Sequence, residues 1–551
     1  MITEQKVKKY FEESFLGDLK AGLITAVVAL PLAIAFAIAS GVEPVMGLYT
    51  AIIAGMLIST FGGSRYSVSG PTGAMTVIVL STVNGHGVEG LLLAGFLAGI
   101  FQILFGIFRL GKVVKYIPLP VISGFTSGIG IIILIGQLSN VFGLVLPARE
   151  HVWETVYDVI AGIDMMNILA LSMFAGTIIL MLLLPKALSN IKYLKNIPAS
   201  IITLVLSVIL TYRFDLEIPI VGEIPSTIPQ IHMLDINIGL MYAVLPAAFT
   251  IALLGTIESL LCAVVCDAMT NTKHNSNKEL IGQGIANVIL PFFAGIPATA
   301  AIARSAVNIR EGAKTRISGI IHSLVLIGIL IFFGPIAQYI PKAYLAGILV
   351  LVSIKMVNVD EIRTTMNISK MDTFVLLTTF ALTVLTDLVF AIQAGMFLSI
   401  ILLFIRLTNI IEVQSMESYD PSEGINATIL ADPYLKDNVA VYTINGPFFF
   451  GAMAVFENKV DEHIHMSKPD MMIRMRYVPF IDTTGIERLK SFIITRKRTG
   501  HKVYLTTVQP EVMRSISSDA VLNKLMQDKD VTIFKSTQEA LGYLQERDGN
   551  R

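Results

Sequence analysis

The chain has 551 residues, of which 54% are hydrophobic and 15% charged, and its formal net charge at pH 7 is zero. Soluble domains carry about 25% charged residues, so this composition indicates an integral membrane protein. The balanced charge excludes the basic footprint of a nucleic-acid-binding protein. The residues after 430 differ, because they have the composition of an ordinary soluble domain.

Apolar segments follow one another along most of the chain, and we interpret fourteen of them as membrane spans. About 20 apolar residues are needed to cross a bilayer. The expected spans are 21–40, 45–62, 71–83, 90–109, 118–138, 164–184, 197–212, 242–268, 280–294, 299–309, 317–334, 338–355, 373–387 and 389–410. The segments 71–83 and 299–309 are too short to cross alone.

Basic residues are unevenly divided between the loops on the two sides. One set of loops is rich in lysine and arginine, whereas the other keeps only Arg149, Arg213 and Lys342. Because basic loops stay in the cytoplasm, we expect an even number of spans in the cell membrane, with both termini on its cytoplasmic side. The predicted organisation is a cytoplasmic N-terminus (1–20), a transmembrane domain (21–411) and a cytoplasmic domain (430–551).

The two short segments are the third and the tenth, which correspond if the chain consists of two sets of seven spans. The first reads SVSGPTGAM and the second IPATAAIARSA, so both pass through proline and threonine into a helix of small residues. An odd repeat inverts the second set in the membrane, and paired interrupted spans of this kind indicate a transporter binding site. We therefore predict a seven-plus-seven inverted repeat with two half-helices that face each other.

Each half-helix would direct unpaired N–H groups and about half a positive charge towards one point. Such a point binds an anion without a cationic side chain. Gly73, Ala300 and Ala301 would allow close approach, and the hydroxyls of Thr72 and Thr299 could donate hydrogen bonds. The alternative is that glycine and proline kink two packed helices without binding a ligand.

Glu258 lies in the middle of the eighth span. A charged carboxylate at bilayer depth is expensive and commonly functional, and burial favours its protonated form. An acid beside an anion site therefore indicates proton coupling, since its protonation removes repulsion. The alternative is a structural acid bonded to the backbone. Asp267, near the end of the same span, is interpreted as a solvated helix terminus.

Arg304 and Phe36 leave two interpretations open. Arg304, in the tenth span, either adds positive potential beneath the anion site or extends to the cytoplasmic surface. Phe36, in the first span, either walls the cavity or only packs against neighbouring helices.

After residue 430 the pattern alternates between strands and helices, which predicts a small α/β domain. Strands are expected within 439–451, 470–479 and 501–508, with a helix at 453–465 and another that begins in the sequence IDTTG. Thr483 follows a strand directly. It is interpreted as the cap of that helix or, alternatively, as a phosphorylation site, because the helix N-terminus favours phosphate.

These motifs resemble those of the sulfate permease (SulP) family, with its bacterial C4-dicarboxylate and sulfate-type members the most similar. The resemblance rests on ALPLAIAFAIASG in the first span, SVSGPTGAM in the third, and the block from GTIESLLCAVV to ATAAIARSAVN. It implies core and gate domains, an elevator movement, a homodimer and a cytoplasmic STAS domain that can bind a protein partner. It also implies that the anion is bordered by Phe36, Thr72, Gly73, Ala300, Ala301 and Arg304, with Glu258 as coupling acid.

The predicted function is proton-coupled symport of a small oxyanion, of the sulfate, C4-dicarboxylate or bicarbonate class. Sodium coupling is less favoured, because Cys262 stands where sodium-coupled relatives have threonine and a thiol is a poor sodium ligand. Leu32 replaces a glutamine of many members and removes one polar ligand. An uncoupled exchanger or channel and a membrane-anchored signalling protein are the alternatives. No enzyme constellation, metal site or cofactor is expected.

Overall fold

The computed structural model describes residues 10–112, 118–146, 149, 151–188, 198–227, 229–231, 233–234, 237–386, 388–410, 412–415, 438–450 and 470–549. The chain divides into two compact units, Met1–Ser399 and Ile400–Arg551. The boundary falls within α17 (Leu388–Ile410).

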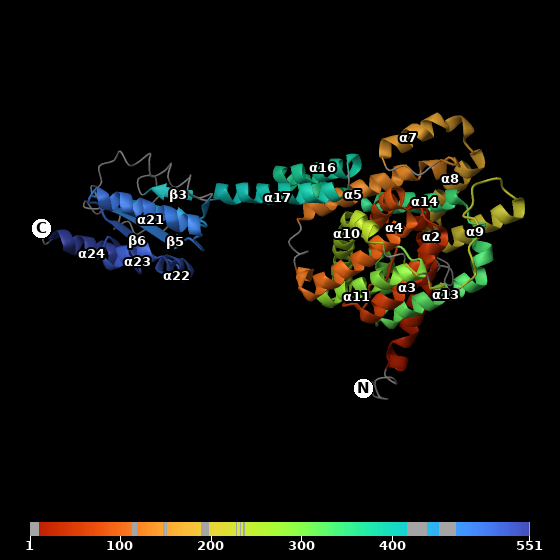
Figure 1. Ribbon diagram of the computed structural model, residues 1–551, viewed down its shortest axis with the longest axis horizontal. Coiled ribbons are helices and arrows are strands. Elements are labelled where there is room, and N and C mark those ends of the chain that lie inside the picture. Colours follow the sequence, from red (N-terminus) through yellow and green to blue (C-terminus); the bar gives the residue numbers. More distant parts are fainter. Residues whose placement is uncertain are drawn as a thin grey trace. The chain divides into compact units, whose positions relative to one another are not determined.

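The first unit is almost entirely helical, as Figure 1 shows. Eight described helices are long and apolar enough to cross a membrane. The principal helices are α2 (Phe15–Ala39), α3 (Pro44–Phe61), α4 (Gly73–Ile107), α5 (Leu119–Gly136), α6 (Leu138–Val141), α7 (Val152–Ala161), α8 (Ile168–Leu188), α9 (Ala199–Phe214), α10 (Ile238–Thr270), α11 (Ser276–Ile289), α12 (Ile302–Arg310), α13 (Ile317–Ala337), α14 (Lys342–Met356), α15 (Val359–Ile368), α16 (Lys370–Leu385) and α17.

Several helix ends follow directly from the local sequence. Pro44 occupies the first position of α3, where its missing N–H and fixed φ are favourable. The Asn275 side chain accepts a hydrogen bond from the N–H of Lys278 and so caps α11. At the other end of α10, Asn271 adopts the left-handed conformation (φ 52°) that commonly ends a helix.

A helix lies at each of the fourteen segments expected to span the membrane. The third and fourth segments are joined in α4, whose backbone breaks at Gly87 (φ 70°). Glycine adopts this positive φ readily, which explains the break. The tenth segment is α12, with only nine residues. The helices α7 and α15 were not expected, because polar residues interrupt their apolar pattern.

The helices of the first unit pack in two groups. The helices α2, α3, α4, α10, α11, α12 and α13 contact mainly one another, whereas α5, α8, α9, α14 and α16 form a second group. Each group takes corresponding helices from both halves of the chain. This arrangement agrees with the predicted inverted repeat, with a core group and a gate group.

The two predicted breaks meet in the core group. The two-residue strands β1 (Ser69–Gly70) and β2 (Thr299–Ala300) pair antiparallel, with Ser69 opposite Ala300 and Gly70 opposite Thr299. The strand β1 leads into α4 at Gly73, and β2 leads into α12 at Ile302. Opposite chain directions at this pair are what an inverted repeat requires.

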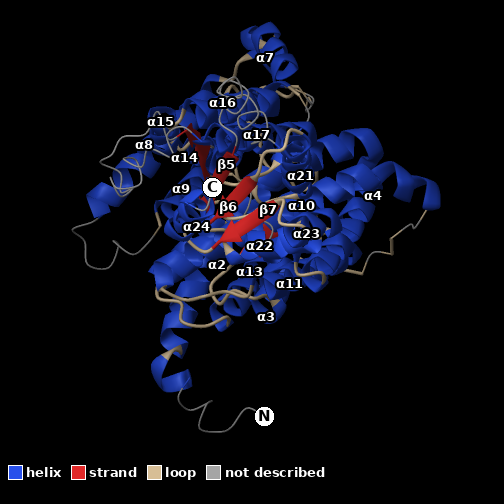
Figure 2. Ribbon diagram, turned by 90° about the vertical axis from the view of Figure 1, so that its left-hand side faces the viewer, coloured by secondary structure: helices blue, strands red, loops and turns tan. Residues whose placement is uncertain are grey.

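The second unit contains a five-stranded sheet with the order β3–β4–β5–β6–β7, drawn red in Figure 2. The strand β3 is antiparallel to β4, and the remaining neighbours are parallel. Apolar side chains form a core on each face of the sheet. The elements are β3 (Glu412–Ser415), β4 (Val439–Asn445), β5 (Asp470–Tyr477), α21 (Thr483–Arg498), β6 (Val503–Thr506), α22 (Pro510–Ser518), α23 (Ala520–Gln527), β7 (Val531–Phe534) and α24 (Thr537–Gly549).

Two details of this unit differ from the sequence-based prediction or lie beyond it. Residues 439–451 were expected to form two strands, but β4 ends at Asn445 and Phe448 forms only an isolated bridge with Ile481. The helix expected at 453–465 lies outside the described residues.

Candidate functional site

The site begins with the residues that precede the two half-helices. Thr72 (φ −133°) and Ala301 (φ −96°) are both extended, and neither side chain caps the helix that follows. The first N–H groups of α4 and α12 therefore donate no hydrogen bond to these side chains. Each helix start also carries about half a positive charge. The β1–β2 pair holds both starts in one place.

Glu258 connects the two breaks. One carboxylate oxygen, Oε2, accepts hydrogen bonds from the Thr72 hydroxyl (2.8 Å) and the Thr299 hydroxyl (2.7 Å). The two hydroxyl oxygens are 3.1 Å apart. Thr72 and Thr299 are buried, whereas Glu258 is partly exposed. The hydroxyls of Thr72 and Thr299 were expected to donate to a ligand, but in this structure they donate to the Glu258 carboxylate. This carboxylate lies between the two helix starts, where an anion would be stabilised.

Arg304 is buried and does not extend to the surface, with only 1% of its area exposed. Its Nη2 donates a hydrogen bond to the carbonyl oxygen of Pro71 (3.0 Å), directly before Thr72. Its Nη1 lies close to Gly70, where an added Cβ would be 2.2 Å away. A side chain at position 70 would therefore displace the guanidinium. Arg304 fixes the start of α4 from α12 and brings a full positive charge beside the site.

Side chains from other helices approach the start of α4 closely at Gly73. A Cβ at this position would lie 3.4 Å from the Phe36 ring, 3.0 Å from Cδ1 of Ile133 and 3.5 Å from the sulfur of Met356. Phe36 therefore packs over the helix start from α2, while Ile133 and Met356 approach it from the gate group. Ala300 and Ala301 are buried on the other half. All eight residues predicted for the anion and proton sites thus gather around the β1–β2 pair.

Amide side chains that the sequence analysis missed hold the second break. Asn287 binds both polar groups of Ala298: its Oδ1 accepts from the N–H (2.8 Å) and its Nδ2 donates to the carbonyl (3.1 Å). Gln283 also donates to that carbonyl. Ser259, next to Glu258, accepts a hydrogen bond from the N–H of Ala300 (3.2 Å). These residues could have been recognised in the sequence as amide side chains within the apolar pattern of α11.

The sequence that builds this geometry matches the model of a known protein family. The model of the sulfate permease family matches residues 15–379, and the model of the STAS domain matches residues 431–540. The chain belongs to the sulfate permease family. It is a multi-pass membrane protein with a C-terminal STAS domain, and its relatives in the family are anion transporters rather than enzymes.

Individual relatives support the assignment. The chain is 37% identical over 530 residues to YvdB of Bacillus subtilis, a candidate sulfate transporter, with 94% of this chain and 96% of YvdB covered. It is 30% identical over 554 residues to the bicarbonate transporter BicA of Picosynechococcus, covering 98% and 96% of the two chains. The solved structure of SLC26A9 superimposes with a TM-score of 0.87 at 19% identity, covering 99% of this chain and 92% of that one. This last likeness shows the shared fold.

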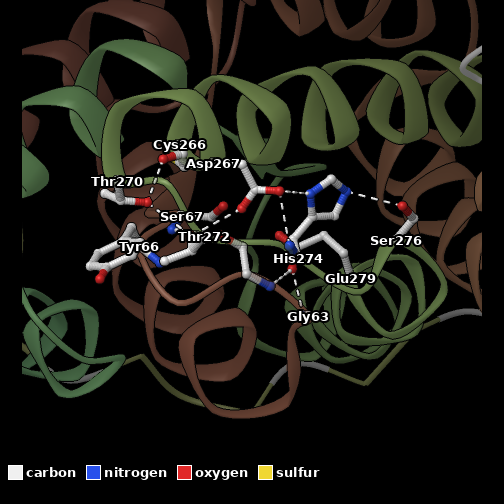
Figure 3. Close-up of polar contacts among 11 residues, drawn as sticks. Gly63, Tyr66, Ser67, Cys266, Asp267, Thr270, Thr272, His274, Ser276 and Glu279 are labelled. Atoms are coloured by element: carbon white, nitrogen blue, oxygen red, sulfur yellow. Dashed lines mark hydrogen bonds and ion pairs between the residues drawn. The ribbon is translucent and has the colours of Figure 1, made fainter.

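In this sulfate permease family member, a polar cluster anchors the loop that leads into β1 (Figure 3). Oε2 of Glu279 accepts hydrogen bonds from the N–H groups of Gly63 (2.6 Å) and Ser64 (2.7 Å). A Cβ at Gly63 would lie 2.0 Å from the carbonyl oxygen of Asn275, so only glycine permits this approach. Glu279 thereby ties the segment before the first break to the start of α11.

Asp267 is a structural acid rather than the solvated terminus that the sequence suggested. Its Oδ2 accepts from the backbone N–H of His274 (2.9 Å) and lies 2.7 Å from His274 Nδ1, as Figure 3 shows. Ser276 Oγ lies 3.0 Å from the other ring nitrogen. Hydrolase triads have this order of side chains. Here, however, the three residues stabilise the turn from α10 to α11 in a transporter, so we assign them a structural role.

We expect Glu279→Ala to destabilise the protein more than Lys278→Ala, an exposed neighbour on the same helix. The substitution leaves two buried N–H groups without an acceptor, which costs roughly 2 kcal/mol or more. Thermal unfolding of the purified proteins in detergent measures the difference. Equal melting temperatures for the two variants would show that Glu279 does not hold the loop.

The structure places Thr483 differently from the sequence-based prediction, and it shows a buried histidine that the sequence analysis did not consider. Thr483 is not the cap of α21: Asp482 is, since its side chain accepts from the N–H of Gly485 (2.7 Å), while Thr483 is exposed at the first helical position. His322 in α13 was overlooked. It is fully buried, and among the described residues neither ring nitrogen has a hydrogen-bond partner. An ionisable side chain in an apolar span was the available signal.

Proposed function

We propose that this chain is a proton-coupled symporter of a small oxyanion, which binds between the starts of α4 and α12. The observation that carries the proposal is the position of the Glu258 carboxylate, held by hydroxyls from both breaks. An ionised carboxylate in this place engages the donors and repels an incoming anion. A protonated carboxyl is a weaker acceptor and carries no charge, so proton and anion bind favourably together.

Coupling to protons would supply the free energy that anion uptake requires. Moving one negative charge into a cell against about 100 mV costs about 2.3 kcal/mol. A proton that travels with the anion cancels one charge, and a proton gradient adds driving force. The hydrogen bonds of Glu258 run to side chains that border the anion site. Protonation can therefore act on the anion directly, without a long coupling path.

The proposed movement is an elevator, in which the core group carries the site past the gate group. Glu258, Thr72, Thr299 and Arg304 all belong to the core group, so the site can move as one body. The gate residues near Gly73, which are Ile133 and Met356, are apolar and make no specific bond that a sliding movement would have to break. A cell-membrane location with both termini in the cytoplasm and a homodimeric state are part of the same proposal.

The substrate class is sulfate, C4-dicarboxylate or bicarbonate. The family description favours sulfate, and the relatedness to BicA favours bicarbonate. Helix starts and hydroxyls recognise negative oxygens in general, and all three anions present them. A sodium-coupled or uncoupled exchanger or channel, and a membrane-anchored signalling protein, are the competing functions.

Uptake by proteoliposomes tests the proposal. Purified protein is reconstituted and offered labelled sulfate, bicarbonate, succinate and fumarate, each with and without an inward proton gradient and with sodium replaced by choline. We expect one of these anions to accumulate only when the proton gradient is present, and independently of sodium. Accumulation that follows sodium instead would replace the proton by sodium, and transport without any accumulation would indicate an exchanger or channel.

We also propose that Thr483 in the STAS domain can be phosphorylated. Its hydroxyl is exposed, and it stands at the start of α21, where the helix dipole favours added negative charge. Mass spectrometry of protein purified from its own cells should show phosphate on the peptide that contains Thr483, and a Thr483→Ala variant should lack it. A fully unmodified peptide under all growth conditions would contradict the assignment.

A further inference from the structure

A cavity of about 250 Å³ lies beside the proposed site, on the side of the membrane predicted to face outwards. It is bounded by the end of α2, the first turns of α4, the outer end of α5, the short helix α6, one side of α7, and the start of α14. A water molecule occupies about 30 Å³ in the liquid, so the cavity can hold a compact oxyanion together with several waters.

Gln137 gives this cavity a hydrogen-bond donor for which the described residues provide no acceptor. The residue is buried, with 4% of its area exposed, and it lines the cavity. Its Oε1 accepts a hydrogen bond from Asn140 (3.1 Å). Within the described part of the chain, nothing accepts from its NH₂ group. The amide nitrogen is not among the fully buried polar atoms that lack a partner, so it is accessible from the cavity, where a ligand or water can accept its hydrogen bond.

Lys342 gives the cavity a second positive charge, in addition to that of Arg149. Only Arg149, Arg213 and Lys342 are basic in the loops predicted to lie outside, and two of these three line this one cavity. Arg149 is paired with Asp158 (2.7 Å). Lys342, by contrast, has no ion-pair partner among the residues that the structure describes. The remaining charge therefore favours an anion.

The floor of the cavity adjoins the central site. Ile133 lines the cavity, and its Cδ1 would lie 3.0 Å from a Cβ at Gly73. Thr76, one turn further along α4, lines the same floor. An anion in the cavity is thus separated from the start of α4 by the Ile133 side chain.

We propose that this cavity is a second anion site, in which Lys342 and the Gln137 amide hold a substrate oxyanion before it passes Ile133 to the central site. The inference rests on the proposed function, since the same anion must then be transported. Positive charge at a cleft raises the local anion concentration and the association rate, and salt screens this effect.

The test compares initial rates from the two sides of the membrane, in right-side-out and inside-out vesicles from cells that express each variant. The variants are Lys342→Gln, Lys342→Arg and Gln137→Leu, with Arg213→Gln as the control, because Arg213 is the outer basic residue that does not line the cavity. We expect Lys342→Gln and Gln137→Leu to raise the outer KM about threefold or more. The inner KM should stay unchanged, and Lys342→Arg should restore the outer value.

Salt dependence provides a second readout that a purely structural effect would not move. Added sodium gluconate should raise the outer KM of the wild type more than that of Lys342→Gln. The second site would be overturned if the variants changed the outer and inner KM equally, changed the inner KM alone, or changed neither. If the wild type itself transports no anion, the proposed function fails; if it transports normally and the variants match it, only the second site fails.

Discussion

Replacing Glu258 with glutamine is expected to abolish proton-driven accumulation while anion exchange across the membrane continues. Glutamine has nearly the same shape as a protonated glutamate, and its side-chain oxygen can still accept from the Thr72 and Thr299 hydroxyls. The variant therefore mimics one protonation state permanently. It can bind and carry the anion, but it cannot release a proton on one side and take one up on the other.

The measurement is uptake by proteoliposomes with an inward proton gradient, followed by counterflow of labelled anion without a gradient. Glu43→Gln is the matched control, because Glu43 is an exposed carboxylate of the same domain. We expect wild type and control to accumulate substrate, and Glu258→Gln to reach only equilibrium. Gradient-driven accumulation by Glu258→Gln would sink the assignment of Glu258 as the coupling acid.

The wild type should also transport faster as the outer pH falls, whereas Glu258→Gln should show a flat profile. A falling pH increases the fraction of protonated carboxyl, which is the form that does not repel the anion. This comparison separates coupling from folding, since a misfolded variant loses rate at every pH without a change in the shape of the profile.

The backbone breaks could be predicted from sequence because they have local causes. Proline and glycine at 70–73, and proline at 297 with small residues after it, disfavour helix wherever they occur. Their equal position in two sets of seven spans predicted that they would meet. The antiparallel pairing of Gly70 with Thr299 is the observation that supports this inference.

The side-chain contacts within the site could not be predicted, because they depend on elements distant in sequence. Arg304 could have faced the site or the surface, and only the packing of α12 against β1 places its guanidinium on the Pro71 carbonyl. Likewise, Glu258 lies 186 positions from Thr72 along the chain. No local pattern specifies that its carboxylate meets both hydroxyls. Asp267 was misjudged for a different reason: its partner His274 is only seven positions away, but it lies in the turn after α10, whose course the apolar pattern does not specify.

The two charges of the site have different proposed tasks, which makes their variants distinguishable. Glu258 is proposed to control when the anion binds, through its protonation. Arg304 is proposed to determine whether the anion binds at all, because its charge is permanent and it holds the start of α4. Losing Glu258 should therefore uncouple transport, whereas losing Arg304 should remove anion binding and with it every mode of transport.

We expect Arg304→Gln to reduce both accumulation and counterflow about 100-fold, the scale for removing one preorganised electrostatic contact. The substitution removes a buried positive charge and the donor to the Pro71 carbonyl, so the helix starts attract the anion less and are less well positioned. Arg304→Lys should recover part of the rate, since lysine keeps the charge but lacks the planar fork of donors. Arg310→Gln, at the exposed end of the same helix, is the control and should resemble the wild type.

Anion binding and folding must be measured alongside these rates. The thermal shift that substrate produces in the purified protein should disappear in Arg304→Gln, while the unfolding transition itself stays cooperative. A variant that transports poorly but is still stabilised by substrate would place Arg304 outside the binding step. If Arg304→Gln instead retains counterflow and loses only accumulation, the division of tasks between Arg304 and Glu258 is wrong, because the permanent charge would then belong to the coupling step.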